Sequence, residues 1–404
     1  MKASILYISY TGLLDPLGQS QVLQYVIGLA PDYQMTLLTF EKPEALRDGD
    51  QLSSLAKQCR QAGIDWHYLQ YHHRPTLPAT LYDMVMGVRR GRQLARSAGA
   101  QVVHCRSYLA GLMGLLVKGA TGARHLFDMR GFWVDERVDG GSWRKESFIY
   151  RFFKRLERVL FTHTDHVVSL TRSGASEIAK LRYLGVPPPV SVIPTCTNLD
   201  MFQPHAKVSG DNESFTLGYV GSAGSWYMFG EVARVVKLLF ETCPASRFLV
   251  INRGSHSEIH EALLREGVDQ ARVDIKAVKF ADVSNEIAKM DAGVFFIKPV
   301  WSKRASSPTR LGEFLACGKP VLTNGMVGDV EADVNETRTG VVINEWKQET
   351  LEQALAQLVG IAREEGIAAR CRSAATERFS LQTGIARYAA IYTSLLSDNK
   401  RSTD

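Results

Sequence analysis

The sequence lacks the features that define several protein classes. None of its apolar runs approaches the ~20 residues that a transmembrane helix needs. Its six cysteines are widely scattered, with no CxxC pair and no Cys/His cluster at the spacing of a zinc site. We therefore expect neither a membrane span nor a disulfide framework nor a bound metal, and reduced thiols favour a cytoplasmic protein.

The sequence also has little excess of charge of either sign. It holds 48 Lys and Arg against 42 Asp and Glu, for a net charge of +6. Because no nucleic-acid-reading motif accompanies this modest excess, we expect no nucleic-acid partner. Basic residues gather in the amphipathic stretch Arg144–Leu160. We expect its apolar residues to face the core, while its Lys and Arg suit peripheral contact with an anionic membrane.

What the sequence does contain is a repeated alternation of short apolar runs and amphipathic helices. Near-continuous apolar strands separated by helices predict parallel, doubly wound sheets of the α/β class. A proline-rich break from Val186 to Asn212 divides the series in two. The first six strands are expected at Ile5–Ser9, Met35–Thr39, Trp66–Leu69, Val102–Cys105, His125–Asp128 and His166–Leu170. The next six are expected at Thr216–Val220, Arg247–Ile251, Arg272–Lys276, Gly293–Ile297, Pro320–Thr323 and Gly340–Ile343.

The predicted organisation is two Rossmann-like domains that face each other across a cleft. The first spans residues 1–205 and the second 206–380, and a final helix at about 382–396 is able to pack back on the first. Ligands of open parallel sheets bind at the carboxyl ends of the strands. Each domain should therefore hold one substrate.

The stretch Ser306–Leu322 is typical of a phosphate site. It reads as a loop, a helix and a buried strand, with Ser307 or a nearby hydroxyl expected to cap the helix and Pro308 expected in its first turn. A helix N-terminus offers free N–H groups and about half a positive charge. Arg310 adds a fixed cation, and Glu313 can accept hydrogen bonds from a sugar diol. Together they predict a nucleotide diphosphate site that needs no metal.

Glycines and cations follow other predicted strands of the second half. Gly221 and Ser222 lie in a turn whose backbone can approach a ligand, but the spacing is not GxGxxG, so NAD is not indicated. Arg253, Lys298 and Lys303 lie near strand ends or before the helix. They can neutralise a leaving diphosphate, although each one alone is explained equally well as a charged side chain exposed to solvent at the edge of the cleft.

Two loops of the first half are candidates for substrate contact. The loop Thr11–Gln21 ends at a helix start near Gly18, whose backbone amides can face the diphosphate. Charged and aromatic residues follow a strand at Asp128–Arg137, and aromatic faces pack on sugar rings while carboxylates accept their hydroxyls. Asp128 is expected to point into the cleft, whereas we expect the strand-end His104 to be structural. The acceptor contacts expected from this run are Arg130, Trp133, Asp135 and Glu136.

These residues resemble those of the GT-B glycosyltransferases, in particular the retaining enzymes of glycosyltransferase family 4. The resemblance covers almost the whole chain and is strongest at Gly12–Gln21, Phe127–Gly141, Tyr219–Tyr227 and Ser306–Asp329. It implies a UDP-sugar or GDP-sugar donor on the second domain, no cofactor and no obligatory metal. Residues that match the family's donor contacts are Gly18 near the leaving phosphate, Thr309, Arg310 and Leu311 on the diphosphate, and Glu313 on the ribose.

The chain departs from the family's pattern at two positions. The first of the family's two glutamates falls on Ala305, where Ser306, Lys303 or a backbone amide has to substitute. Many members have a histidine where this chain has Asp128. Sugar recognition is therefore less well defined by the resemblance than the fold is.

The expected activity is transfer of a sugar from a nucleotide diphosphate sugar to a hydroxyl acceptor, with retention of configuration. The expected acceptor is a lipid-linked glycan at the inner face of the cytoplasmic membrane, as in exopolysaccharide, capsule or O-antigen lipopolysaccharide synthesis. Two alternatives stay open, a GT-B nucleotide-sugar epimerase and a non-catalytic GT-B partner subunit, the latter because of Ala305. The loop around Trp133 favours a larger acceptor and thus a transferase.

Overall fold

The computed structural model describes residues 2–204 and 214–401, and the chain divides into two units. The first unit comprises Met1–Pro194 together with Leu381–Asp404, and the second comprises Thr195–Ser380. We expected the boundary between residues 205 and 206, which lie outside the described residues. The units separate at Pro194 instead, because the next residues bond to the second unit: the hydroxyl of Thr195 donates to the carbonyl of Ser307, and the N–H of Thr197 donates to the carbonyl of Phe379. The expected linker also contains a further strand, Val190–Val192, which pairs with the sheet of the first unit.

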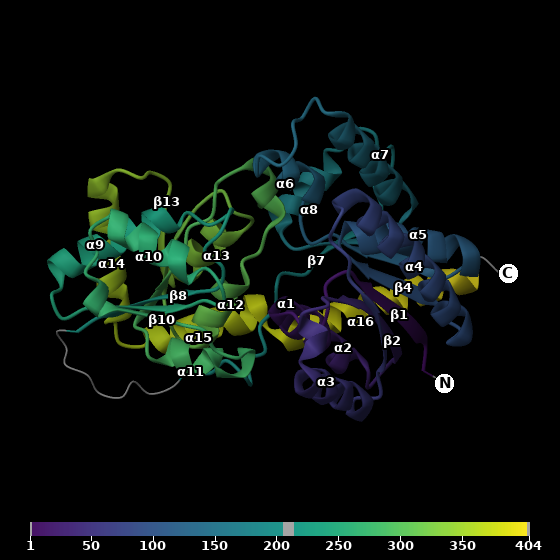
Figure 1. The fold of residues 1–404 in the computed structure, drawn as a ribbon, viewed down its shortest axis with the longest axis horizontal. Helices are drawn as coiled ribbons and strands as arrows, with labels where there is room; N and C mark the ends of the chain where they lie inside the picture. Colours follow the sequence, from purple (N-terminus) through teal and green to yellow (C-terminus); the bar gives the residue numbers. More distant parts are fainter. Residues whose placement is uncertain (1, 205–213, 402–404) are drawn as a thin grey trace. The chain divides into compact units, whose positions relative to one another are not determined.

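The first unit is built on a parallel sheet whose strand order is β3-β2-β1-β4-β5-β6-β7 (Figure 1). Ser9 pairs with Arg106, and Arg106 pairs with Asp128, so the carboxyl ends of three neighbouring strands are level. The order reverses between β1 and β4, which is the position where such sheets bind ligands. The strands are β1 (Ser4–Ser9), β2 (Gln34–Glu41), β3 (Asp65–Gln70), β4 (Val102–Arg106), β5 (Arg124–Asp128), β6 (His166–Ser169) and β7 (Val190–Val192).

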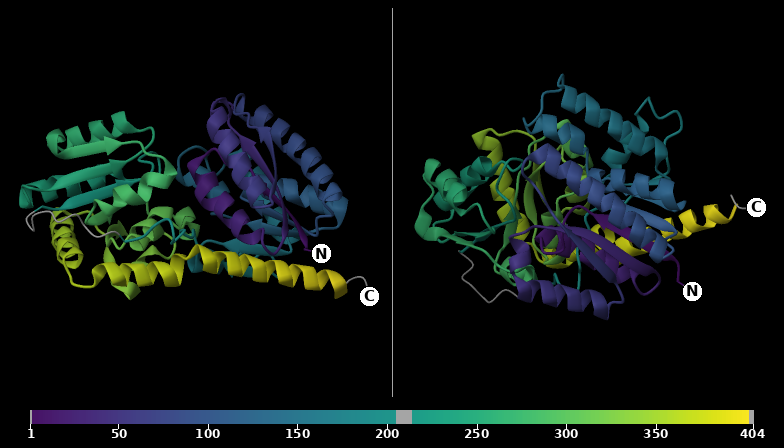
Figure 2. Two further views of the ribbon diagram at one scale, coloured as in Figure 1. Left: turned by 90° about the horizontal axis from the view of Figure 1, so that it is seen from below. Right: turned by 45° about the vertical axis from the view of Figure 1, so that its right-hand side comes forward.

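Helices cover both faces of this sheet. His104 of β4 contacts Tyr392 on one face, while the neighbouring Cys105 lies against Gly114 on the other, since successive strand residues point to opposite faces. The helices α4 (Thr76–Ser97), α5 (Tyr108–Thr121) and α7 (Phe148–His163) form one layer, and α2 (Gln24–Leu29) and α16 (Leu381–Arg401) lie in the other (Figures 1 and 2). The remaining helical segments of this unit are α1 (Pro16–Gly18), η1 (Gln19–Leu23), η2 (Ala45–Arg47), α3 (Gly49–Gln61), α6 (Trp133–Asp139) and α8 (Arg172–Ala179).

The second unit has a parallel sheet in the order β10-β9-β8-β11-β12-β13. Its strands are β8 (Thr216–Val220), β9 (Arg247–Ile251), β10 (Val273–Lys276), β11 (Ala292–Val294), β12 (Val321–Asn324) and β13 (Gly340–Ile343). Its helical segments are α9 (Phe229–Thr242), α10 (His256–Arg265), η3 (Gln270–Arg272), η4 (Phe280–Asp282), α11 (Val283–Ala288), η5 (Trp301–Ala305), α12 (Thr309–Ala316), α13 (Val330–Thr337), α14 (Gln348–Ala362) and α15 (Ile367–Phe379).

The predicted fold class, two Rossmann-like units with doubly wound parallel sheets, is confirmed. β11 is shorter than predicted because the residues after Val294 leave the strand, and Ile297 bonds instead to the side chain of Asn324. Within the part of the chain that the structure describes, no helix has the length and apolarity needed to cross a bilayer.

Candidate functional site

Helix α12 begins without a side-chain cap. Pro308, expected in the first turn, occupies the N-cap position, and no side chain of the described chain caps the helix there. The predicted cap is wrong, since the hydroxyl of Ser307 accepts a hydrogen bond from the backbone N–H of Thr195 at 3.3 Å and lies 2.9 Å from the Thr195 hydroxyl. The N-terminus of α12 is therefore left for a ligand to complete.

The guanidinium of Arg310 is fixed beside the turn that follows β8. Arg310 is buried, and its Cζ lies 4.2 Å from the ring centre of Tyr227 and 4.8 Å from that of Tyr219. Its Nη2 donates a hydrogen bond to the carbonyl of Ser222 at 3.3 Å. Gly221 has a φ of +101°, and a Cβ there would lie 2.6 Å from Nη2, so both the backbone conformation and the space require glycine. The structure thus brings Gly221, Ser222 and Arg310 together.

Glu313 lies one turn further along α12 and is 8% exposed. Burial raises the pKa of its carboxyl to about 7, although the charge of Arg310 opposes that shift. Within residues 2–204 and 214–401, its carboxyl takes part in no hydrogen bond or ion pair. A carboxylate in this state can still accept hydrogen bonds from a pair of ligand hydroxyls.

The other predicted donor residues of the second unit lie in different environments. Lys303 is buried, with its Nζ 3.9 Å from the ring centre of Trp226. Arg253 and Lys298 are exposed, and Arg253 Nε donates a hydrogen bond to the carbonyl of Val278 at 3.3 Å. Leu311 is buried in the core, so only its backbone is available to a diphosphate. Thr309 and Ser306 are half-buried at the start of α12, whereas Ala305 is fully buried.

Two asparagines that the sequence interpretation missed hold the loops at the strand ends. Asn252 Nδ2 donates to the carbonyl of Gly221 at 2.8 Å, and its Oδ1 accepts from the backbone N–H of Ser255. Asn324 Oδ1 accepts from the N–H of Ile297 at 2.8 Å, and its Nδ2 donates to the carbonyl of the same residue. An asparagine directly at the end of an apolar run is the signal that could have identified both.

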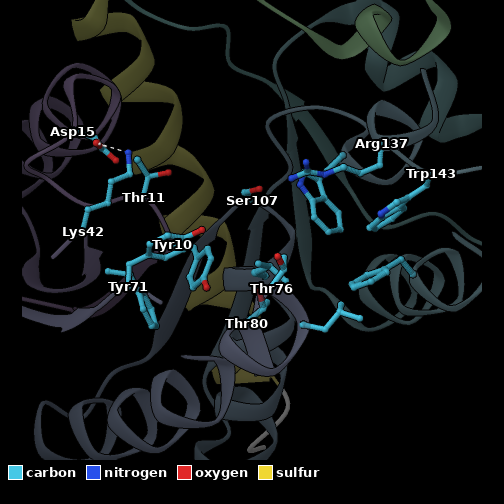
Figure 3. A pocket seen from close by; sticks show the side chains of 15 residues that line it. Tyr10, Thr11, Asp15, Lys42, Tyr71, Thr76, Thr80, Ser107, Arg137 and Trp143 are labelled. Atoms are coloured by element: carbon cyan, nitrogen blue, oxygen red, sulfur yellow. Dashed lines mark hydrogen bonds and ion pairs between the residues drawn. The ribbon is translucent and has the colours of Figure 1, made fainter. Parts of the chain in front are cut away.

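The first unit contains a pocket of about 420 Å³ near the carboxyl ends of β1 and β4 (Figure 3). Tyr10 and Tyr71 lie on one side of it, Arg137 and Trp143 lie on the other, and Ser107 lies between them (Figure 3). The aromatic residues that line it are Tyr10, Phe40, Tyr71, Trp133, Trp143 and Phe153. Together with the ion pair between Lys42 and Asp15, at 2.9 Å, they suit the apolar faces and hydroxyls of a glycan.

Only some of the acceptor contacts predicted in the segment Asp128–Arg137 line this pocket. Trp133 lines it, and Arg137 lies over the Trp133 ring at 5.1 Å from its centre. Asp135 does not line it, because its carboxylate accepts hydrogen bonds from Tyr150 at 2.8 Å and Lys154 at 3.0 Å and so joins α6 to α7. Glu136 is half-buried beside Gly131, outside the lining. The sequence interpretation missed most of the pocket, whose residues come from separate loops.

Asp128 does not point into an open site as expected. It is 1% exposed, and its Oδ2 accepts a hydrogen bond from the hydroxyl of Tyr388 in α16 at 3.1 Å. Arg130 Nη1 lies 3.6 Å and His104 Nε2 3.9 Å from the same oxygen. Burial tends to raise the pKa of Asp128, but Arg130, His104 and Arg106 together outweigh it and hold that pKa below its ordinary value. The C-terminal helix thus encloses the carboxylate.

The loop after β1 is held by a buried carboxylate. Glu41 accepts hydrogen bonds from the backbone N–H groups of Leu13 at 2.7 Å and Leu14 at 3.0 Å. Gly18 is buried at the end of α1, and a Cβ there would lie 1.9 Å from the carbonyl oxygen of Gly12. Close packing of backbone on backbone therefore accounts for this glycine.

The two Rossmann-like units have the GT-B fold, with an open helix N-terminus in one unit and an aromatic pocket in the other. Residues 19–196 match the family model described as glycosyl transferase 4-like domain. The chain as a whole resembles the glycosyltransferases of family 4. A comparison of the sequence with curated proteins found no match.

Solved structures share the fold over nearly the whole chain. Sucrose-phosphate synthase from Thermosynechococcus elongatus is 15% identical with a TM-score of 0.75, covering 98% of this chain and 100% of that one. Anabaena HepE in complex with UDP-glucose is 14% identical with a TM-score of 0.69, covering 97% and 99%. A Listeria monocytogenes protein described as a UDP-N-acetylglucosamine 2-epimerase is 12% identical with a TM-score of 0.62, covering 98% of this chain and 97% of that one.

Proposed function

We propose that this protein transfers a sugar from a nucleotide diphosphate sugar to a hydroxyl acceptor, with retention of configuration. The observation that carries the proposal is the uncapped N-terminus of α12 beside a fixed guanidinium, Arg310, and a buried carboxylate, Glu313. The helix terminus and Arg310 bind the diphosphate, and Glu313 binds the ribose. UDP is the favoured nucleotide, because the structurally similar HepE binds UDP-glucose.

The proposed chemistry uses fixed cations in place of a metal ion. The bond from the sugar to the diphosphate breaks, and a bond from the sugar to the acceptor oxygen forms on the same face of the ring. The acceptor proton passes to the departing phosphate oxygen, so no protein base is required. Arg310, Lys303 and Lys298 stabilise the charge that develops on the leaving group. Asp128, being buried, holds Arg130 in position.

The acceptor of the proposed reaction is a lipid-linked glycan at a membrane surface. Its sugar rings enter the aromatic pocket of the first unit, where Trp133 lies. Leu77, which lines that pocket, is 59% exposed and belongs to an apolar stripe on α4 that continues at Leu81 and Val85. This continuity lets the glycan occupy the pocket while its lipid stays in the bilayer.

Helix α7 also exposes apolar residues, beside basic ones. Phe148 is 73% exposed and Phe152 and Val159 are each 44% exposed, so the expectation that the apolar residues of this stretch face the core is wrong for these three. The neighbouring Arg151 and Arg155 are also exposed. Exposed aromatic and basic residues on one amphipathic helix suit an anionic membrane surface, which supports a peripheral location at the inner face of the cytoplasmic membrane.

Titration of the purified protein with UDP and with GDP, each with and without EDTA, tests the proposal. Calorimetry gives the affinity, and a ligand at ~100 times its dissociation constant should add about 2.7 kcal/mol to the free energy of unfolding. We expect one nucleotide to bind equally well with and without EDTA. Binding of neither nucleotide would contradict the donor site and favour a non-catalytic partner subunit.

A nucleotide-sugar epimerase is the second candidate, supported by the fold shared with the Listeria protein. An epimerase converts a UDP-sugar without an acceptor, whereas a transferase only hydrolyses it slowly. Incubation with the UDP-sugar that binds best, followed by chromatography of the products, separates the two. We expect no isomerised UDP-sugar, because the aromatic pocket suits a second substrate.

A further inference from the structure

Two arginines and one carboxylate lie together at the ends of strands β4 and β5. Arg106 ends β4, Asp128 ends β5, and Arg130 follows two residues later. Arg106, the last residue of β4, is 5% exposed. Among the described residues, its side chain finds no hydrogen-bond or ion-pair partner. Arg130, whose side chain is 9% exposed, donates from Nη2 to Gln21 Oε1 at 3.3 Å and lies 3.6 Å from Asp128. Asp128 forms its ion pair with Arg130 and acts on Arg106 only through its electrostatic field, so one carboxylate is shared by two guanidinium groups.

The other groups around the arginines do not supply the missing negative charge. Burial lowers the pKa of His104, so its ring is neutral, and its Nδ1 lies 2.6 Å from the hydroxyl of Tyr392. Burial also raises the pKa values of Tyr7 and Tyr388, which keeps both phenols protonated. Burial and the charge of Arg130 lower the pKa of Arg106. One buried positive charge is thus left without a counter-ion, which is costly inside a protein.

Unsatisfied polar atoms also indicate that an anion is missing beside the arginines. Arg106 Nε, Arg130 Nε and Asp128 Oδ1 are each buried with no hydrogen-bond partner. Arg106 pairs in the sheet with Ser9, the last residue of β1, so it lies at the point where the strand order reverses. Ser107, the next residue, lines the aromatic pocket.

We propose that Arg106, with Arg130, binds a phosphate group of a substrate in the first unit. Guanidinium groups suit phosphate because each can donate two parallel hydrogen bonds to its oxygens. The assignment rests on the proposed function for the nature of the substrate. The phosphate comes either from a phosphorylated acceptor or from the donor diphosphate, and the two sources make the same contacts with the arginines.

The test measures binding of inorganic pyrophosphate and phosphate by calorimetry and by the melting temperature. The variants are Arg106→Gln and, as a matched control, Arg60→Gln, which removes an exposed cation from the same unit. We expect Arg106→Gln to weaken pyrophosphate binding about tenfold or more and Arg60→Gln to leave it unchanged. Without added anion, Arg106→Gln should melt at the same temperature as the native protein or higher, because it removes an uncompensated charge.

Repeating the titration with UDP at saturation separates the sources of the phosphate. Pyrophosphate binding that persists under UDP and depends on Arg106 supports an acceptor phosphate, and competition by UDP supports the donor diphosphate. Absence of UDP binding with intact Arg106-dependent binding would overturn the proposed function alone. Equal pyrophosphate binding by Arg106→Gln and native protein would overturn the anion site. If Arg106→Gln does not fold, pyrophosphate binding by Arg106→Lys tests the site instead. We expect the lysine to retain only part of the affinity for pyrophosphate, and an unchanged affinity would overturn the anion site.

Discussion

At the scale of single residues, Glu313 is a buried carboxylate whose acceptor capacity no described residue uses. If it binds the ribose, Glu313→Ala should weaken UDP binding by about 1–3 kcal/mol, or roughly 5- to 150-fold in the dissociation constant. Calorimetry with UDP measures this change. Glu331→Ala, at a half-buried glutamate of α13, is the control and should leave the affinity unchanged. An unchanged affinity in Glu313→Ala would remove the residue from the site.

The same residue makes stability depend on pH. Its pKa is about 7 in the folded protein against an ordinary value of 4.5, so the folded state holds the proton more tightly than the unfolded state does. Ionisation of Glu313 therefore lowers the free energy of unfolding as the pH rises from about 4.5 through 7. Glu313→Gln should therefore raise the free energy of unfolding at pH 8 by up to roughly 3 kcal/mol, and the difference should vanish below about pH 4.5. Urea unfolding of both proteins at a series of pH values checks the sign. A variant less stable at pH 8 would contradict it.

At the scale of elements, the exposed residues of α7 predict membrane contact. Replacing Phe148 and Phe152 by serine should reduce sedimentation of the protein with vesicles containing anionic lipid, because both rings are exposed beside basic residues. Leu264→Ser is the control, since Leu264 is 60% exposed on α10 of the second unit. Equal sedimentation of the double variant and the native protein would argue against this surface.

The loop between β1 and α2 depends on close backbone packing at Gly18. A Cβ at this position would lie 1.9 Å from the carbonyl of Gly12, and the atom it meets cannot move without shifting the loop held by Glu41. Gly18→Ala should therefore lower the free energy of unfolding by about 1–3 kcal/mol. Gly49→Ala is the control, because a Cβ there meets nothing within 4 Å. Thermal melts of both variants compare the two sites.

At the scale of the whole molecule, the first unit is completed by the end of the chain. Tyr388, Ile391, Tyr392 and Leu395 of α16 are buried, and two of them bond to Asp128 and His104. Each such side chain stabilises by about 1.5–3 kcal/mol, and a typical domain has only ~5–15 kcal/mol of net stability. The discontinuous first unit should therefore depend on residues 381–404.

A truncated chain tests this dependence. A chain that ends at Ser380 should fail to fold its first unit, and proteolysis should leave a fragment of the second unit. A chain that ends at Ser397 keeps all four buried side chains and should resist proteolysis like the native protein. Equal resistance of the two truncated chains would show that α16 is dispensable.

The sequence by itself determined the type of fold. Strands β8, β9 and β13 begin and end where the pattern predicts them, because parallel strands buried on both faces read as short apolar runs. β7 escaped prediction, since it is short, only partly buried and set in a proline-rich stretch. The proximity of Arg310 and Glu313 was also predictable, because one helix start carries both.

Tertiary structure alone decided what surrounds the other candidate residues. The hydrogen bond between Tyr388 and Asp128 joins residues 260 positions apart, so no local pattern reveals that the carboxylate is buried. The aromatic pocket collects side chains from separate loops and helices, and Arg106 is distinctive only because no acidic side chain among the described residues forms an ion pair with it. Local sequence sets the periodicity and the ends of the elements. Which side chains meet, and which charges remain unpaired, depends on how distant elements pack.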